Sequence, residues 1–254
     1  MKPLILITND DGYSAKGIAE LSKIAAEFGD VVVMAPDLNA SGKSHSLTTD
    51  RPLRVTPISH NEGVSVFACS GTPVDCVKLA CEHFCCRKAD LVLSGINHGS
   101  NASVNVLYSG TMGAVIEASN NGYPAIGFSI LDHDPDADFS LCIPYIRQII
   151  STVIEKGLPE KVSLNVNFPQ ASAEGYQGLK ICRESKALWS DSFERRQDPH
   201  GADYYWLTGN FICDDKAPDT DQYALENGYV SVVPTTTDFT AHAALSTLTK
   251  QFEQ

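Results

Sequence analysis

Two adjacent carboxylates, Asp10 and Asp11, directly follow a short apolar run that begins at Leu4. An apolar run of this length, bounded by a turn signal, is typical of a buried parallel strand. Ligands bind outside the carboxyl ends of such strands, so we expect both carboxylates at the mouth of a sheet. They repel each other unless a proton, a donor or a cation lies between them, and a hard divalent cation is the simplest occupant. The alternative is a polar strand end that caps the next helix through Asp11 or Ser14.

Two further polar loops follow predicted strands and offer oxygen ligands. Ser41 lies after the strand predicted over residues 31–35, and Asn97 lies after the strand predicted over residues 90–94. Because the carboxyl ends of parallel strands meet at one edge of a sheet, both side chains are expected near the acidic pair. Carboxylate, hydroxyl and amide oxygens, completed by water, suit Mg²⁺ or Mn²⁺. The His and Cys spacings do not match those of a zinc site, and a lone His such as His98 is more often a hydrogen-bonded loop residue than a ligand.

A third polar element, Ser109-Gly110-Thr111, opens a predicted helix. Glycine lets the backbone approach a ligand closely, and the free N–H groups of a helix N-terminus, together with the helix dipole, form an anion site. The alternative is ordinary N-capping by Ser109 or Thr111. Beside an acidic metal loop, an anion site suggests phosphate, and the reaction class would be metal-assisted hydrolysis of a phosphomonoester.

Strands alternate with helices through the first two thirds of the chain. This order predicts an α/β fold with a Rossmann-like, doubly wound and mostly parallel sheet. We expect a catalytic core over residues 1–168, an extended β-arm over residues 169–218, and a returning strand with a C-terminal helical tail over residues 219–254. Within these parts, the predicted elements are strands at 4–8, 31–35, 90–94, 124–129, 163–166 and 228–234, a small hairpin insertion over 51–70, β-like pieces at 179–183 and 204–208, and helices near 18–28, 72–84, 110–121 and 137–157.

Composition excludes several classes of protein. The 254 residues, 43% hydrophobic and 20% charged, are ordinary for a globular protein of one large domain, or of one domain with an appendage. A net charge of −12 argues against binding a nucleic-acid polymer, which needs a basic stripe. The sequence contains no apolar run long enough to cross a membrane. Eight scattered cysteines without a Cys-x-x-Cys pair indicate a reduced, cytoplasmic protein.

Five motifs occur in a fixed order: Asn9-Asp-Asp-Gly12, Ser41-Gly-Lys-Ser44, Gly71-Thr-Pro-Val-Asp75, Ser94-Gly-Ile-Asn97 and Tyr108-Ser-Gly-Thr111. Together they resemble the SurE-type survival-protein family. The resemblance runs from residue 4 to about residue 130 and returns at residues 228–231. It implies a metal-dependent 5′-nucleotidase that hydrolyses nucleoside monophosphates, with a C-terminal arm exchanged between subunits in a homodimer or homotetramer.

The resemblance also implies roles for individual residues. One divalent ion, Mg²⁺ or Mn²⁺, would be held by Asp10, Asp11, Ser41 and Asn97, and Asp10, Asp11 and Asn97 would be catalytic. Beyond the resemblance, our own hypothesis is that Asp10 orients or deprotonates the attacking water. Phosphate would lie against Asn105, Ser109, Gly110 and Thr111. Two further features are noted beside this set: Asp238 and His242 match a family pattern and are expected to form a structural pair on one helix face, whereas Lys43 departs from the usual pattern.

Three other classes of protein place acids after a first strand. A haloacid-dehalogenase-type phosphatase needs a nucleophilic Asp where this chain has Asn9. A receiver module needs a phospho-accepting Asp at the end of the third strand, where this chain has Ser94-Gly-Ile-Asn97. A zinc deacetylase needs His ligands at spacings that the chain lacks. The sequence leaves open the preferred base, the physiological metal, the choice between dimer and tetramer, the general acid, and activity on 3′-nucleotides or polyphosphate.

Overall fold

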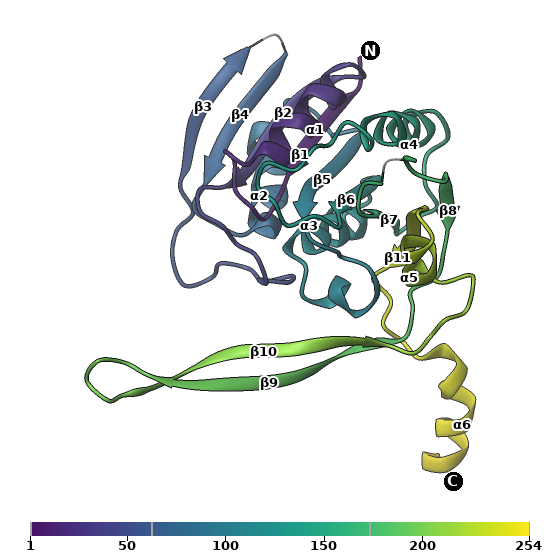
Figure 1. Ribbon diagram of the computed structural model, residues 1–254. Coiled ribbons are helices and arrows are strands. Elements are labelled where there is room, and N and C mark those ends of the chain that lie inside the picture. Colours follow the sequence, from purple (N-terminus) through teal and green to yellow (C-terminus); the bar gives the residue numbers. More distant parts are fainter. Residues whose placement is uncertain (1, 62, 173, 254) are drawn as a thin grey trace.

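The computed structural model describes residues 2–61, 63–172 and 174–253. Within these residues, nine strands form one mixed sheet in the order β3-β4-β2-β1-β5-β6-β7-β11-β8 (Figure 1). The predicted α/β fold with a mostly parallel sheet is confirmed. The strands of this sheet are β1 (Leu4–Thr8), β2 (Asp30–Pro36), β3 (Val55–Asn61), β4 (Val64–Cys69), β5 (Leu91–His98), β6 (Ala125–Ile130), β7 (Val162–Phe168), β8 (Leu179–Ile181) and β11 (Val230–Thr236).

The centre of the sheet contains a topological switch point between β1 and β5. Strand β1 pairs in parallel with β2 on one side and with β5 on the other. From β1 the chain runs outward through β2 to β4, and then returns to β5 and continues through β6 to β7 in the opposite direction. Loops that leave β1 and β5 therefore diverge, and the crevice between them is where open α/β sheets bind ligands.

Helices cover both faces of the sheet. Side chains in β1 alternate between the faces, so Ile5 and Ile7 join one buried apolar cluster and Leu4 and Leu6 join the other. Helices α1 (Lys16–Ala26) and α4 (Ile143–Lys156) pack on the first cluster, and α2 (Pro73–Leu79) and α3 (Gly110–Asn120) pack on the second. A π-helical turn (Ala80–Phe84) extends α2, and a short 3₁₀ helix (Ser103–Leu107) precedes α3.

Three predicted elements differ from the structure. The helix expected over residues 137–157 begins only at Ile143, because Pro144 favours the first turn of a helix over its interior. The predicted hairpin over residues 51–70 exists, but β4 pairs in parallel with β2, so it belongs to the main sheet and is no insertion; Glu62 of its turn lies outside the described residues. Strand β5 extends through Asn97 to His98, past the predicted end at Ser94.

The arm in the structure is shorter than the predicted range of residues 169–218. Strand β8 pairs with β11 in the main sheet, and the arm itself is a ribbon of β9 (Ala187–Gln197) and β10 (Asp203–Cys213) that runs away from the body (Figure 1). The sequence did not indicate β9 because most of its side chains are exposed on both faces and so show no apolar alternation. After the arm follow α5 (Asp221–Glu226) and α6 (His242–Phe252).

Helix α6 projects from the end of the chain, and every one of its described side chains stays at least partly exposed (Figure 1). None of the helices that the structure describes is both long and apolar enough to cross a membrane.

Candidate metal and phosphate site

The turn after β1 is built by Asn9 and Gly12. The Asn9 side chain donates to the Gly12 carbonyl at 3.0 Å and accepts from the Gly12 N–H at 3.1 Å. Gly12 has a φ of +105°, a backbone conformation that residues with a Cβ rarely adopt. Because Asn9 is fully buried and both ends of its amide are used in this turn, it is a structural residue. The turn places Asp10 at the switch-point crevice, with Asp11 next to it in the chain.

Asp10 is buried against the N-terminus of α3. Its Oδ1 accepts a 2.5 Å hydrogen bond from the Thr111 hydroxyl. Gly110 packs directly behind it, since a Cβ added to Gly110 would lie 2.8 Å from Asp10 Cβ. Burial raises the pKa of Asp10, and hydrogen bonds from the Thr111 side chain and from backbone N–H groups at the helix start oppose that rise.

Asp11 has a buried oxygen, Oδ2, that finds no hydrogen-bond partner among the described residues. Burial, followed by the neighbouring charge of Asp10, raises the pKa of Asp11 to about 6, with His98 acting in the opposite direction. Two adjacent carboxylates with raised pKa values and an unsatisfied oxygen make a site that a divalent cation would stabilise. The residues present therefore fit a metal ion.

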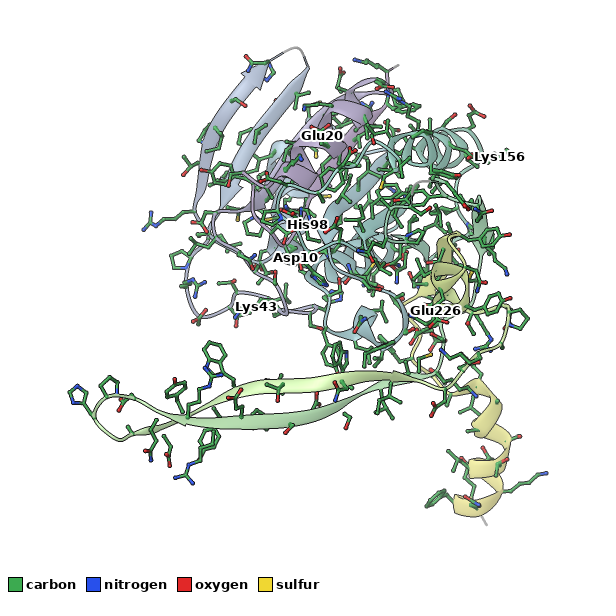
Figure 2. All side chains as sticks on the ribbon, viewed as in Figure 1. Asp10, Glu20, Lys43, His98, Lys156 and Glu226 are labelled. Carbon is green, nitrogen blue, oxygen red and sulfur yellow. The ribbon has the colours of Figure 1, made fainter. Side chains whose placement is uncertain are left out.

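A cavity of about 420 Å³ opens at the switch point. Five of the residues expected in the site line this cavity. The other expected residues, Asp11, Gly110 and Thr111, and also Lys43, are not part of its wall. Figure 2 shows Asp10 and His98, which also lines the cavity, close together below the sheet. The five lining residues are Asp10, Ser41, Asn97, Asn105 and Ser109.

Asn97, at the end of β5, is 8% exposed. Its Nδ2 donates to the Gly99 carbonyl at 2.9 Å, which turns Oδ1 away from that carbonyl and leaves Oδ1 available as an acceptor or ligand atom. The predicted ligand set thus supplies two carboxylates, one hydroxyl and one amide oxygen. Within the described part of the chain, no group of three or more His, Cys, Asp or Glu residues is placed to hold a metal.

The loop that carries Ser41 is tied to the site at several points. The Ala40 N–H donates to the Asp10 carbonyl at 2.7 Å, and the Ser44 hydroxyl donates to the Leu107 carbonyl at 2.6 Å. Farther along the loop, His45 lies 2.9 Å from Glu117 of α3. These contacts hold an exposed loop against two other elements of the site.

The phosphate side is formed by the start of α3 and by the loop before it. Ser109 is the N-cap of α3, and its Oγ accepts from the Met112 N–H at 3.0 Å, so its own hydroxyl hydrogen is free to donate elsewhere. Thr111 directs its hydroxyl to Asp10, which makes it a support for that carboxylate. Asn105 Oδ1 accepts from the indole N–H of Trp189 at 2.8 Å.

Sequence reasoning missed most of the remaining wall of the cavity. Tyr108, His133, Trp189 and Phe211 line it together with His98. Trp189 and Phe211 come from the arm, and the only sequence signal for them was the aromatic character of that segment. His133 had no signal.

The predicted pair of Asp238 and His242 forms a 2.6 Å contact. Asp238 precedes α6 and His242 is its first residue, so the pair closes the turn into the helix. The expectation that both residues lie on one helix face is therefore wrong. Hydrogen bonds from the side chain and backbone of Thr240, and then from His242, lower the pKa of Asp238.

Comparisons of the sequence and of the fold with known proteins show the family. The family model described as "Survival protein SurE" matches residues 5–191. Proteins named "5′-nucleotidase SurE" from Flavobacterium psychrophilum and Flavobacterium johnsoniae are 54% and 50% identical over 248 residues, each covering 97% of this chain and 96% of the relative. The crystal structure of SurE protein from Aquifex aeolicus aligns with a TM-score of 0.83 at 35% identity, over 98% of this chain and 99% of that one.

Proposed function

The chain belongs to the SurE family of survival proteins, and from that premise we propose that it is a metal-dependent 5′-nucleotidase, a phosphoric monoester hydrolase that converts nucleoside 5′-monophosphates to nucleoside and phosphate. The observation that carries the proposal is the cavity in which the buried Asp10 carboxylate lies against the N-terminus of α3, with Asp11 next to it in the chain. The names of relatives at about half identity over nearly the full chain support the same reaction.

A single divalent ion, Mg²⁺ or Mn²⁺, would be held by Asp10, Asp11, Ser41 and Asn97. When bound, the ion neutralises the carboxylate pair and polarises a phosphate oxygen as a Lewis acid. The oxygen-only donor set and the unpartnered oxygen of Asp11 support this choice over a softer metal.

The chain's own groups act on the water and on the phosphate. Asp10 orients the attacking water and accepts its proton, the leaving 5′-oxygen takes up a proton from solvent, and the hydrogen bond from Thr111 holds the carboxylate in one position. The Ser109 hydroxyl and the Asn105 amide donate to phosphate oxygens, and the dipole of α3 stabilises the charge that develops on them. Catalysis in this scheme rests on positioning and electrostatics, with no covalent intermediate, since Asn9 stands where a nucleophilic Asp would be needed.

We further propose assembly into a homodimer or homotetramer through the C-terminal arm. The ribbon of β9 and β10 carries apolar side chains in solvent, among them Phe193 and Leu207, which are about two-thirds exposed and lie opposite each other across the two strands. Exposed apolar patches of this kind mark interaction surfaces. A cytoplasmic location is proposed on the cysteines, all eight of which are free in the structure.

The test is phosphate release from nucleoside 5′-monophosphates, nucleoside 3′-monophosphates, polyphosphate and general phosphomonoesters, each with EDTA, Mg²⁺ or Mn²⁺. We expect metal-dependent release that favours 5′-nucleotides, and the Asp10→Ala variant should lose at least about 100-fold in turnover. As a second readout, Mg²⁺ or Mn²⁺ should raise the thermal midpoint of the wild type but not that of Asp10→Ala. Metal-independent release, or near-normal turnover by Asp10→Ala, contradicts the proposal.

A further inference from the structure

The arm sends one aromatic side chain into the site. Trp189, on β9, lies 84 positions along the chain from Asn105 and donates its indole N–H to Asn105 Oδ1 at 2.8 Å. Its ring meets that of Phe211 on β10 edge-on, with centroids 5.7 Å apart at 65°. Despite these two contacts, 40% of Trp189 stays exposed. An aromatic ring that is fixed by two contacts and still partly exposed is suited to stacking.

Trp189 stands where two cavities meet. The cavity of about 420 Å³ contains Asp10 and Ser109, and a second cavity of about 530 Å³ runs along the arm past Asp191. Both are lined by Asn105, Tyr108 and Trp189. A substrate whose phosphate lies at Asp10 and Ser109 therefore has room to extend toward the arm, and the walls it meets there are aromatic.

We propose that Tyr108 and Trp189 form the nucleobase subsite, with the base stacked against the exposed indole surface at the junction of the two cavities. This inference rests on the proposed nucleotidase function and names what selects a nucleotide over other phosphomonoesters. Stacking on aromatic rings tolerates all bases, because every base has a π-face. The subsite therefore favours nucleotides as a class and does not select one base over the others.

The same indole also positions a group at the phosphate end. An indole N–H is a donor only, so it pairs with the oxygen end of the Asn105 amide. The amide nitrogen of Asn105 then points away from Trp189 and is available to donate to a phosphate oxygen. Trp189 thus acts at both ends of the substrate, and its two contributions are separable because one needs the ring and the other needs the N–H.

Kinetics on two substrates separate these contributions. AMP and ribose 5-phosphate share the reacting group, but only AMP has a base. We expect Trp189→Leu to lower kcat/KM for AMP at least about tenfold more than for ribose 5-phosphate, mostly through KM, which is the size of effect that one base–aromatic stack supplies. Trp189→Phe keeps a ring and removes the N–H, so it should lower kcat/KM for both substrates by a similar factor.

Trp206→Leu is the matched control. Trp206 is the second of the two tryptophans, lies on β10 of the same arm and lines neither cavity. This variant should keep the wild-type ratio of AMP to ribose 5-phosphate. Circular dichroism and the solution mass of each variant show whether the fold and assembly are retained.

A binding measurement keeps the test independent of Trp189 variants that fail to fold. In Trp206→Phe, Trp189 is the only tryptophan, and adenosine, a product that cannot be hydrolysed further, should quench its fluorescence saturably, whereas ribose should not. In Trp189→Phe, adenosine should leave the fluorescence of Trp206 unchanged.

The outcomes of these experiments distinguish a failure of the nucleotidase function from a failure of the nucleobase subsite. Phosphate release from neither substrate by the wild type refutes the nucleotidase function itself. Release from both substrates, combined with an unchanged AMP preference in Trp189→Leu or no quenching by adenosine in Trp206→Phe, leaves that function standing and overturns the nucleobase subsite.

Discussion

The hydroxyl of Thr111 donates to Oδ1 of Asp10 across 2.5 Å, although the two residues are 101 positions apart in the chain. This bond joins the start of α3 to the carboxyl end of β1. Thr111 was expected to contact phosphate, but its hydroxyl is directed to Asp10, the carboxylate that is proposed to orient and deprotonate the attacking water.

Removing the Thr111 hydroxyl should affect chemistry more than substrate binding. Thr111→Val keeps the volume but frees Asp10 to rotate, so we expect kcat to fall about 10- to 100-fold with little change in KM. Thr111→Ser restores a hydroxyl and should recover most of the loss. Steady-state kinetics on a nucleoside 5′-monophosphate measure both variants, and wild-type kcat in Thr111→Val would show that the bond is not needed.

Gly110 should be intolerant of a side chain. In Gly110→Ala the new Cβ would lie 2.8 Å from Asp10 Cβ and 2.9 Å from Asp10 Oδ2, so the carboxylate or the helix start must shift. A displacement of this size is expected to lower kcat/KM about 100-fold while circular dichroism shows a folded protein. The control is Asn120→Ala at the exposed end of the same helix, which should retain wild-type kinetics. Equal activity of the two variants would contradict the close approach.

Glu117 should make stability depend on pH. Burial tends to raise the pKa of Glu117, but hydrogen bonds from Lys78, His45 and Asn121 together outweigh burial and lower it below the ordinary value of 4.5. A carboxyl whose pKa is lower in the folded state stabilises the fold above its unfolded pKa, and this stabilisation is lost as pH falls through the folded pKa. At pH 7, Glu117→Gln should therefore be about 2 kcal/mol less stable than the wild type.

Below about pH 4.5 the difference in stability between the two proteins should narrow, since the carboxyl of the unfolded wild type takes up a proton first and that of the folded protein follows at lower pH. Urea unfolding at pH 7, 5 and 3.5 measures it. Glu155→Gln, at an exposed position of α4, is the control and should change stability by less than about 0.5 kcal/mol at every pH. If the difference in unfolding free energy between the wild type and Glu117→Gln stayed constant with pH, the charge of the carboxylate would not be what stabilises this contact.

A charge on one face of the arm should reduce the assembly. Phe193 and Leu207 face each other across β9 and β10, so Phe193→Asp places a carboxylate in the proposed interface. We expect a smaller solution mass by light scattering. Ser192→Asp puts the same charge on the neighbouring position, which points to the opposite face of the ribbon, and should keep the wild-type mass. An unchanged mass in Phe193→Asp would place the interface elsewhere.

Local patterns carried much of the fold and part of the site. Apolar runs such as residues 4–8 and turn residues such as Gly12 act over a few positions, so the strand, the turn and the acidic pair after it were all readable from the sequence. Pairing of distant segments was not readable. Strand β9 has no apolar alternation of its own and exists because β10 pairs with it, and the parallel pairing of β4 with β2 turned an expected insertion into part of the sheet.

The sequence by itself thus determined which oxygen-bearing side chains follow the central strands, because strand, turn and cap signals are local in the chain. Only the tertiary structure decided what those side chains do for one another. It directed Thr111 to Asp10, brought Trp189 of the arm to Asn105, and buried an oxygen of Asp11 that has no hydrogen-bond partner among the described residues. Such contacts join residues tens of positions apart, and a single hydrogen bond between distant side chains leaves no periodic trace in a sequence.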